Sequence, residues 1–427
     1  MKKWIIAGVI IAVVVMASVG AVGYVVLRQA YSKPDVVKSL TQLPRNGRIW
    51  HAAWSPDGQK ILYESSGMWV IDPDGQNEVY LGEGDYPVWS PDGSQIVFVS
   101  DNGLGVVNAD GGVRRLLVSL AEVDLPESDD KWIDSAAWSP DAGMIAFEAG
   151  VFIPDPSDVW EQTGTSISGV WIVDADGGNL RQLATDLAES YGASWSPDSE
   201  SIAFTSRNGG DWDIYIADVA GSGLQQLTTS PASESDLRWS PSGESIAFTS
   251  TSGDDSDIYV VDVVGGGLQQ LTTSPANDWE PRWSPDGTKI AFVSGYTPEK
   301  QDDPEIWLMD TDGSHKVQLA KGSESYDYPA WSPDGSMIAF SSTRLGPLGD
   351  IWLVNPDGSG RTKLTRTSRS SFTCNPKSIC YEEPKWSPDG KRLLFLNRLT
   401  EWESWRSSGS GYDRLWVLEL DLEKGMS

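Results

Sequence analysis

Short apolar segments alternate with polar turns along most of the chain. After each turn comes a run rich in β-branched and aromatic residues, as at Ile61 to Tyr63 and Ile202 to Phe204. A further run follows in which apolar and polar positions alternate with a period of two, as at Ile258 to Val261. Runs of this length, composition and period predict short β-strands, so we expect an all-β chain.

The turns carry a repeated motif, Trp-Ser-Pro, followed in most copies by Asp-Gly. Its eight copies begin at Trp54, Trp89, Trp138, Trp195, Trp239, Trp283, Trp331 and Trp386. Pro presets φ at the second position of a tight turn, Asp bonds back to nearby backbone, and Gly tolerates a positive φ. Each copy therefore predicts a hairpin turn. The mean spacing of about 47 residues is the period of propeller blades.

Each repeat contains four predicted strands. The third strand ends in a second Asp/Gly turn, such as the one at residues 310–313, and a fourth strand closes the unit, as at Leu224 to Leu227. Four antiparallel strands repeated radially make a β-propeller, and eight motifs predict eight blades. Seven blades plus one degenerate unit is the alternative.

The eighth unit lacks a fourth strand, because few residues follow Leu420. The sequence Leu-Thr-Gln-Leu at residues 40–43 resembles the fourth-strand sequences Gln-Leu-Thr at residues 226–228 and 270–272. We therefore expect the N-terminal segment to complete blade eight, which removes an exposed sheet edge.

The repeat as a whole is similar to a known family. Trp-Ser-Pro-Asp-Gly, an Ile-Ala-Phe-like strand, Asp-Ile-Trp/Tyr and an Asp-x-Asp-Gly turn resemble the WD-repeat-like propeller repeats of periplasmic TolB and of the propeller domains attached to prolyl oligopeptidases. The resemblance covers about Leu40 to Leu420. It implies protein–protein scaffolding, although such propellers also accompany enzymes, and a shared fold alone does not fix a function.

The N-terminus carries the longest apolar stretch of the chain, Trp4 to Leu27, preceded by two lysines. At about 1.5 Å per residue a helix of this length crosses a hydrocarbon core of about 30 Å. We expect residues 1–3 in the cytoplasm, a transmembrane anchor at 4–27, a linker at 28–38 and the propeller at 39–424, outside the cytoplasm (periplasmic or extracellular). A cleaved secretory signal peptide is the alternative.

The only two cysteines, Cys374 and Cys380, lie in one predicted loop. An even pair in an exported chain predicts a disulfide; two free surface thiols is the alternative. With no neighbouring His, they do not predict a zinc site.

The charge is strongly acidic, with 32 Lys and Arg against 61 Asp and Glu and a net charge of −29. Such a surface repels nucleic acid, so we expect no nucleic-acid partner. Most acids fall in the repeated turns, where they cap backbone groups. No cofactor is expected, apart from a calcium ion between clustered carboxylates such as Asp254, Asp255 and Asp257 as a minor alternative.

The two faces of the predicted ring differ. One face, the plain-turn face, carries the short motif turns. The other, the insertion face, carries the long segments 119–133, 149–169, 366–383 and 397–414. Binding surfaces concentrate in loops on a rigid scaffold, so we expect function on the insertion face. An N-terminal tether that feeds an outermost strand places the membrane on the plain-turn side.

Aromatic residues in the insertions predict a cleft across this face. Its walls are formed by Trp132, Phe152 and Trp160 on one side and by Phe372, Tyr381, Trp402 and Trp405 on the other. Trp212 is one of the remaining tryptophans outside the repeated positions. Exposed aromatics there suit protein or carbohydrate contact. The alternative is that each ring only packs its own loop.

The positions three and four residues before each motif Trp predict an acidic, aromatic-edged funnel at the channel mouth. They hold Trp50 and His51, Asp85 and Tyr86, Asp134, Tyr191, Asp236, Trp279 and Glu280, Asp327 and Tyr328, and Glu382 and Glu383. The funnel could hold a cation, a sugar or a basic peptide. A solvated rim that pairs with Arg238, Arg282 and Lys385 is the alternative.

Enzymatic chemistry is disfavoured by the shortage of histidine. Only His51 and His315 are present, and the chain has no Gly-x-Ser-x-Gly elbow. A serine hydrolase needs a nucleophile, a base and an orienting acid, so we expect no peptidase activity. A glycosidase that uses a carboxylate pair, from acids such as Asp134, Glu280 and Glu382, stays open. The expected function is binding of another protein, with carbohydrate or cell-wall polymer binding as the second hypothesis.

Overall fold

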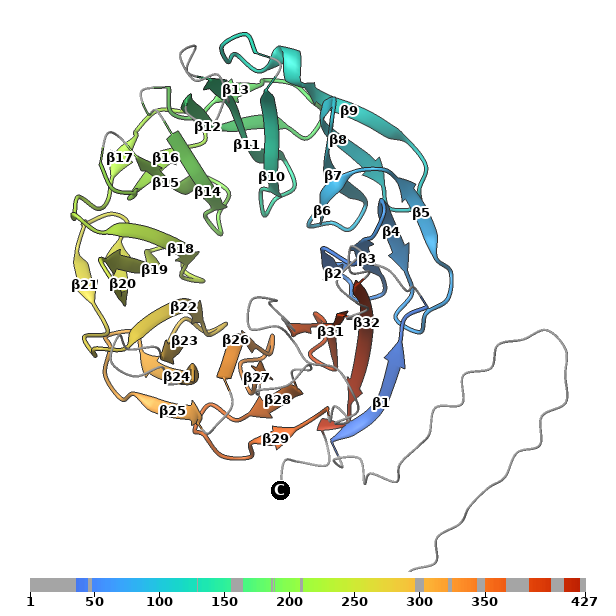
Figure 1. Ribbon diagram of the computed structural model, residues 1–427, viewed down its shortest axis with the longest axis vertical. Helices are drawn as coiled ribbons and strands as arrows, with labels where there is room; N and C mark the ends of the chain where they lie inside the picture. Colours follow the sequence, from blue (N-terminus) through green and yellow to red (C-terminus); the bar gives the residue numbers. More distant parts are fainter. Residues whose placement is uncertain are drawn as a thin grey trace, which may run out of the picture. The chain divides into compact units, whose positions relative to one another are not determined.

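The computed structural model describes residues 36–44, 48–128, 130–154, 164–185, 187, 189–207, 210–295, 303–321, 325–343, 350–365, 384–400 and 411–422. Within these residues, the strands form eight antiparallel sheets of four strands each. Seven of the sheets follow one another in chain order around a ring, and the eighth joins the two ends of the described chain (Figure 1). The predicted eight-bladed propeller is confirmed.

The first four blades run from the innermost to the outermost strand in sequence order (Figure 1). Blade 1 contains β2 (Ala52–Trp54), β3 (Ile61–Glu64), β4 (Met68–Ile71) and β5 (Val79–Gly82). Blade 2 contains β6 (Asp85–Trp89), β7 (Gln95–Ser100), β8 (Gly103–Asn108) and β9 (Arg114–Ser119), followed by the 3-10 helix η1 (Leu120–Glu122). Blade 3 contains β10 (Lys131–Trp138), β11 (Met144–Pro154), β12 (Gly164–Asp174) and β13 (Arg181–Gln182). Blade 4 contains β14 (Glu189–Trp195), β15 (Ser201–Arg207), β16 (Asp213–Asp218) and β17 (Gln225–Gln226).

The next three blades repeat this order, and blade 8 differs in its last strand. Blade 5 contains β18 (Ser233–Trp239), β19 (Ser245–Ser252), β20 (Asp255–Asp262) and β21 (Leu268–Gln270). Blade 6 contains β22 (Asn277–Trp283), β23 (Lys289–Gly295), β24 (Glu305–Asp310) and β25 (Val317–Ala320). Blade 7 contains β26 (Ser325–Trp331), β27 (Ile338–Thr343), β28 (Asp350–Val354) and β29 (Thr362–Lys363). Blade 8 contains β30 (Lys385–Trp386), β31 (Arg392–Thr400), β32 (Gly411–Leu420) and β1 (Val37–Gln42).

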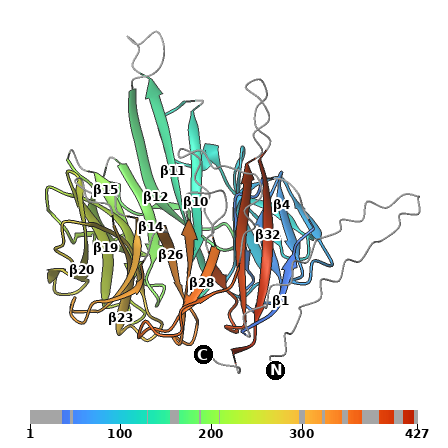
Figure 2. The same ribbon diagram turned by 60° about the horizontal axis from the view of Figure 1, so that its bottom comes forward.

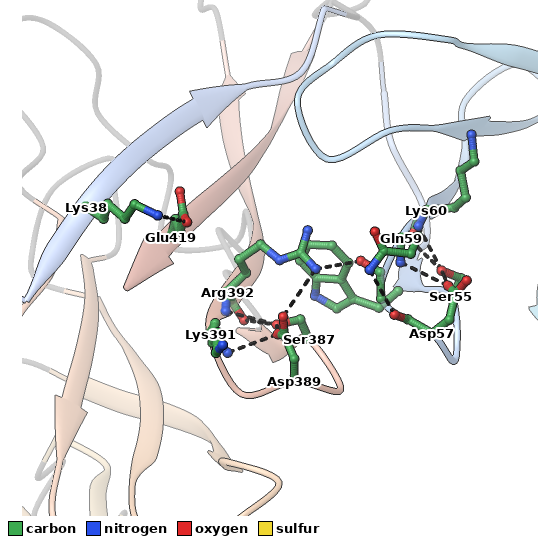
Figure 3. Close-up of polar contacts among 12 residues, drawn as sticks. Lys38, Ser55, Asp57, Gln59, Lys60, Ser387, Asp389, Lys391, Arg392 and Glu419 are labelled. Atoms are coloured by element: carbon green, nitrogen blue, oxygen red, sulfur yellow. Dashed lines mark hydrogen bonds and ion pairs between the residues drawn. The ribbon is translucent and has the colours of Figure 1, made fainter. Parts of the chain in front are cut away.

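The ring closes through β1, as the sequence predicts. This strand pairs antiparallel with β32, with Leu40 opposite Leu418 and Gln42 opposite Trp416. Glu419 of β32 binds the Lys38 ammonium at 2.6 Å (Figure 3). On the other side of the closure, Arg392 of blade 8 donates to the Gly58 carbonyl at 2.7 Å and so ties blade 8 to blade 1. Pairing of the first and last strands leaves no free sheet edge at this point of the ring.

The motif turn is held by its own side chains. In blade 1, the Ser55 hydroxyl donates to Asp57 at 2.6 Å and accepts the Lys60 backbone N–H at 2.8 Å. Asp57 also accepts the Gln59 N–H at 2.9 Å, and Gly58 takes a φ of 67°. A positive φ is costly for residues with a Cβ, which explains why Gly occupies this position in most copies. The turn therefore satisfies its own polar groups.

The motif tryptophans connect neighbouring blades. Each of seven indoles donates its Nε1–H to the carbonyl that precedes the motif Trp of the adjacent blade, at 2.9–3.3 Å; these are Trp54, Trp138, Trp195, Trp239, Trp283, Trp331 and Trp386. Trp89 is the exception, because its buried Nε1 has no hydrogen-bond partner within the described residues. The repeated Trp thus serves as an interblade contact, with a large apolar face and one directed hydrogen bond.

The hydrophobic core consists of layers between blades. A buried aromatic residue recurs on the second strand of each blade: Tyr63, Phe98, Phe147, Phe204, Phe248, Phe292, Phe340 and Phe395. In the layer between blades 4 and 5, Phe248 packs with Ile214 and Leu227 of the preceding blade. Each blade therefore buries one face against each neighbour, which fixes the positions of the innermost strands around the channel.

Two predicted loops on the insertion face are in part extended hairpins (Figure 2). The pairing of β11 with β12 continues from Ala149 opposite Gly169 out to Pro154 opposite Gly164. The pairing of β31 with β32 continues to Thr400 opposite Gly411. Interstrand hydrogen bonds extend these segments, so part of each insertion is rigid.

Several predictions lie outside the described residues. These are the transmembrane anchor at 4–27, the cysteine pair Cys374 and Cys380, and the segment 366–383. In the part of the chain that the structure describes, no helix has the length and apolar character needed to span a bilayer.

Candidate functional site: the channel rim

A left-handed bulge interrupts the innermost strand of most blades at the same position. Three residues before the motif Trp, the backbone has a positive φ of 50–71°, at Tyr86, Ser135, Gly192, Asp236, Glu280 and Tyr328. The strand register shifts at the same points, for example between Asp85 and Val88 and between Trp279 and Arg282. An extra residue in one strand re-aims its side chains, and a non-glycine residue in this conformation is strained. Five of these six residues have a Cβ, so the wall of the channel stores strain.

Buried glutamates hold two of these bulges. Glu64 of blade 1 is 6% exposed and accepts the Tyr86 N–H of blade 2 at 3.1 Å. Glu148 of blade 3 is 7% exposed and accepts the Gly192 N–H of blade 4 at 2.7 Å. Burial raises the pKa of the Glu148 carboxyl above its usual range. Carboxylates on the second strand of one blade thus position the channel-facing backbone of the next.

Three aromatic rings form an arc on the rim of blades 3 and 4. The rings of Trp132 and Tyr191 lie nearly parallel, with centroids 6.2 Å apart and an interplanar angle of 5°. Trp212, from the β15–β16 connection, lies 5.3 Å from Tyr191 at 59°. Offset stacked and tilted pairs of this kind are the favoured aromatic geometries. All three rings are only half-buried.

The surroundings of this arc fix its geometry. Gly150 of β11 leaves room for the Trp132 indole, because a Cβ at this position would overlap the ring. The Arg207 guanidinium lies 5.5 Å from the Trp212 ring and is paired with Glu189 at 2.9 Å. A cation over an aromatic face is attracted by the negative face of the ring. The arc is therefore positioned by Gly150 at the Trp132 end and by Arg207 at the Trp212 end.

A second aromatic group occupies the rim of blades 1 and 2. Trp50 is 46% exposed and stacks under the Arg48 guanidinium at 3.8 Å. Tyr86 is 44% exposed and meets the His51 ring edge-on at 5.3 Å. His51 is bonded through Nδ1 to Glu64 at 3.0 Å. The carboxylate of Asp134 on blade 3 is the largest cause of the raised pKa of the Tyr86 phenol, so the two groups lie close enough to interact.

A cavity of about 510 Å³ lies on the rim between blades 4 and 5. It is lined by Tyr191 and Trp212 of the arc and by Glu234, Asp236 and Arg238 of β18. Sites for small groups are concave, mostly apolar and carry a few polar groups in fixed positions. The arc and this cavity together are the site that we consider for function.

The predicted rim residues on blades 6 and 7 have a different environment. Trp279 packs against the buried core between these blades. Glu280 lies 3.9 Å from Arg282, and burial raises the pKa of Asp327 to about 6. Tyr328 lines a separate cavity of about 560 Å³ toward the plain-turn end, together with Arg238, Arg282, Lys385 and motif tryptophans of blades 5 to 8. On this half of the ring, the predicted funnel is built mainly of packed and charged residues.

The proposed cleft is only partly described. Phe152 lies over Gly164 of its own hairpin, which is the packing role considered as its alternative. Trp160, Phe372, Tyr381, Glu382, Trp402 and Trp405 lie outside the described residues. Of the predicted wall residues, Trp132 is the one that the structure brings together with other rim aromatics.

Three contributors were not predicted to belong to the site. Trp212 lies on a short connection, at a position where the repeat does not place a tryptophan. This departure from the repeated Trp positions is the signal in the sequence that could have identified it. Glu148 lies in the apolar strand β11, where a single charged residue is the signal that could have found it. Glu234 lies in the polar strand β18 beside Asp236, so the sequence gives no signal that sets it apart.

The described part of the chain offers neither a metal-binding cluster nor a catalytic triad around its histidines. There, no three His, Cys, Asp or Glu side chains gather closely enough to hold a metal ion, and this includes Asp254, Asp255 and Asp257. His315 contacts Ser314 at 3.0 Å and Asp310 at 2.8 Å, but both contacts use Nδ1. A catalytic triad needs the acid and the nucleophile on opposite ring nitrogens, so this cluster is not one.

Comparison with known proteins identifies the repeat. Residues 171–301 match the family model PD40, the TolB beta propeller domain. The TolB-like resemblance of the repeat is thereby supported over this segment. A comparison with curated proteins found no match.

Solved structures share the fold. Oligogalacturonate lyase from Vibrio parahaemolyticus has a TM-score of 0.52 and 16% identity, covering 73% of this chain and 90% of that protein. Dipeptidyl peptidase 4 from Porphyromonas gingivalis has a TM-score of 0.57 and 13% identity, covering 83% of this chain and 58% of that protein. A puromycin-hydrolyzing peptidase from Mycobacterium tuberculosis has a TM-score of 0.53 and 16% identity, covering 86% and 60%. Likeness at this identity shows a common propeller architecture and leaves activity open. The chain spans less than two thirds of the length of either peptidase.

Proposed function

We propose that this chain is a membrane-tethered propeller outside the cytoplasm that binds another protein through its insertion face. The observation that carries the proposal is the arc of Trp132, Tyr191 and Trp212 beside a cavity of about 510 Å³ on the channel rim. Half-exposed aromatic rings on a rigid support are the residues that dominate binding energy at protein interfaces.

The composition of the rim favours a protein partner. Trp50 and Tyr86 are 46% and 44% exposed, and Val88 beside them is 37% exposed, so blades 1 and 2 add apolar surface to the arc. Asp134 lies close enough to Tyr86 to raise the pKa of its phenol, and Asp236 lines the cavity beside Tyr191. A partner that brings apolar groups together with basic ones matches both features.

Binding, not catalysis, is the activity that these residues suit. A hydrolase of the serine type needs a base with an accessible second ring nitrogen next to a nucleophile. His51 is bonded to Glu64 and packed on Tyr86, and His315 lies in an exposed turn. His315 does contact the Ser314 hydroxyl, but Asp310 contacts the same ring nitrogen, so this turn lacks the arrangement in which the acid and the nucleophile use opposite nitrogens.

A capture experiment tests the proposal. The full-length protein is used as bait in detergent-solubilised membranes of its own source, beside a variant with Trp132→Ala and Trp212→Ala. Tyr80→Ala is the matched control, because Tyr80 is as exposed as Trp50, at 46%, but lies on the outermost strand β5. We expect one protein to be captured by the native chain and by the control and lost with the rim variant. Equal capture by all three would refute the proposal.

Carbohydrate binding is the second candidate, favoured by one observation. The Trp132 and Tyr191 rings are parallel to within 5°, with Asp134 on the strand of the first and Asp236 in the adjacent cavity. Parallel rings with acids between them suit sugar rings. Screening polymeric glycans against the same three proteins distinguishes the candidates: glycan binding that the rim variant loses, without protein capture, supports the second. Cleavage of a bound glycan would support the glycosidase alternative.

A further inference from the structure

A separate cavity of about 400 Å³ lies on the side of blade 5 that faces blade 4. One wall is the connection between these blades, at residues 230–232, and the others are strands β18, β19 and β20. Exposed residues border it at both Pro231 and Asp255, so solvent reaches it. Glu234 lines this cavity and also the rim cavity beside the aromatic arc.

Three carboxylates line this cavity: Glu234, Asp255 and Asp257. Glu234 is 4% exposed. Its Oε1 accepts from the Ser230 hydroxyl at 2.7 Å. The nearby Ser250 hydroxyl lowers the pKa of this carboxyl, but the buried Oε2 makes no hydrogen bond of good geometry within the described residues. A buried carboxylate oxygen without a donor is costly, and such a group in a native structure calls for a ligand or water.

Among the described residues, no cationic side chain lines this cavity; Lys316 acts on Asp257 from outside it. Asp257 is 9% exposed and is bonded to Thr272 at 3.0 Å and Gln270 at 2.8 Å, both of which are neutral. Because hydrogen bonds from neutral groups do not cancel a charge, the cavity holds negative potential that a cation would neutralise.

Apolar side chains also line the cavity. The rings of Phe248 and Tyr259 stack at 5.8 Å and 22°, and Ala232 and Leu268 continue the surface. An amphiphilic side chain buries its methylene stem on such a surface and keeps its charged head with the acids.

The acids are not arranged for a metal ion, since no set of three ligands within the described chain comes close enough to hold one. A longer organic cation, which spans the space between an aromatic floor and a carboxylate rim, fits this spacing better.

Blade 4 provides an internal comparison. It has the same aromatic pair, Phe204 and Tyr215 at 6.0 Å, and the same third-strand acid, Asp213. At the position of Glu234, however, it has Ser190, which donates to Ser206 at 3.2 Å. The inner acid is therefore absent from blade 4. Blade 6 has the shorter Asp278 at this position, so the longer Glu234 distinguishes the blade 5 cavity from both neighbours.

We infer that the blade 5 cavity is a receptor for a lysine or arginine side chain of the bound partner, with Glu234 and Asp257 on the cationic head and Phe248 and Tyr259 along the stem. This inference rests on the proposed function, since it specifies the chemistry of the partner at the rim.

Electrostatics agree with this assignment. Burial raises the pKa of Glu234 to about 7, and it also raises that of Asp257. The acids near Glu234 are Asp213 of β16 and Asp255 and Asp257 of β20, with the Tyr259 phenol beside them. Two cations lie on other sides: Arg238 lines the rim cavity with Glu234, and Lys316 acts on Asp257. Acids outnumber these cations, so a bound cation stabilises the ionised form of Glu234. Affinity for the cation is expected to rise between pH 5.5 and pH 8.

The test uses the full chain in detergent and three small probes: the N-acetyl, N-methylamide derivatives of lysine, arginine and norleucine, titrated by ligand-observed NMR. We expect the two cationic probes to bind and norleucine, which has the stem without the charge, not to bind. Glu234→Gln preserves size and the Ser230 contact and is expected to weaken arginine binding at least tenfold at pH 8, about 1.4 kcal/mol. It should also remove the pH dependence.

Asp350→Asn, at the start of the third strand of blade 7, is the control and is expected to change arginine binding less than threefold. Norleucine binding equal to lysine, an unchanged affinity in Glu234→Gln, or an equal loss in Asp350→Asn would each overturn the inference. The variant Trp132→Ala with Trp212→Ala should still bind the probes. Probe binding without partner capture would therefore refute the proposed function alone, and partner capture without probe binding would refute this inference alone.

Discussion

The carboxylates of the motif turns and those of the insertion side behave in opposite ways. In the turns, a hydrogen bond from the motif serine is the main cause that lowers the pKa of the aspartate, at Asp57, Asp92, Asp141, Asp198, Asp286 and Asp334. Near the channel and between blades, burial raises the pKa of Glu148, Glu234, Asp278 and Asp327. The first set is satisfied by its own turn. In the second set, Glu234 and Asp278 each have one buried oxygen without a hydrogen-bond partner in the described part of the chain.

This difference separates the residues that build the ring from those that are available to a ligand. A group whose hydrogen bonds are complete gains little from a partner, whereas a buried carboxylate without a donor gains much. The same division holds for tryptophan: the motif indoles donate across blades, while Trp132 and Trp212 stack on the rim. Residues of the same type therefore have different roles, depending on whether the repeated motif provides partners for their hydrogen bonds.

The largest effect is expected from two tryptophans of blade 4, Trp195 in the motif and Trp212 on the rim. Trp195→Ala removes a buried ring and its bond to Ala137, so we expect a loss of about 3–5 kcal/mol in the free energy of unfolding. Trp212→Ala, on the rim, is expected to cost about 1 kcal/mol or less while abolishing partner capture. Chemical denaturation followed by circular dichroism measures both. A large loss in Trp212→Ala would place this residue in the scaffold instead.

The next effect concerns pH and stability. The folded pKa of Glu234, about 7, is above its ordinary value of 4.5, so protonation favours the folded state. The stability that the folded state gains by binding this proton is fully present below about pH 4.5 and is lost as the pH rises through 7. Glu234→Gln mimics the protonated form and should stabilise the protein by on the order of 3 kcal/mol at pH 8, shrinking to below about 1 kcal/mol at pH 5.

Unfolding of the native protein and Glu234→Gln at several pH values gives this difference directly. Below about pH 4, both proteins should lose stability together, because the motif aspartates have lowered pKa values and their contribution is lost on protonation. If the difference in the free energy of unfolding between the two proteins did not change with pH, burial would not raise the pKa of Glu234.

A smaller effect tests the interblade hydrogen bond. Trp195→Phe loses the bond from Nε1 to the Ala137 carbonyl at 3.0 Å, whereas Trp89→Phe loses an Nε1–H that has no acceptor within the described chain. Both lose similar volume, so the difference between them isolates the hydrogen bond. We expect Trp195→Phe to be more destabilising by about 1 kcal/mol. Equal losses would show that packing alone connects the blades.

Much of the fold follows from the sequence because the repeat is local. The motif turn needs only residues within five positions of Ser55, so its strands and their count are predictable. Closure by β1 is predictable because Gln42 and Leu43 copy a fourth strand. The hairpin extension at residues 164–168 was missed, since this side of the hairpin carries small and polar side chains that resemble a loop.

The site was less predictable, because it arises between blades. Trp132 and Tyr191 were both expected near the channel, but their stacking depends on Gly150 and on the ring geometry. The left-handed bulges leave no sequence signal, since five of the six positions hold Tyr, Ser, Asp or Glu, not Gly. Glu234 needs the neighbouring blade and linker before its missing partner is visible.

Site-specific photocrosslinking in the native membrane tests the central claim most directly. A photoreactive amino acid replaces either Trp212 on the rim or Val264, which is 90% exposed in the turn between β20 and β21 on the plain-turn face. Our account predicts a discrete adduct with one protein from position 212 and none from position 264. An adduct from position 264 alone would contradict it, because the binding surface would then lie on the plain-turn face.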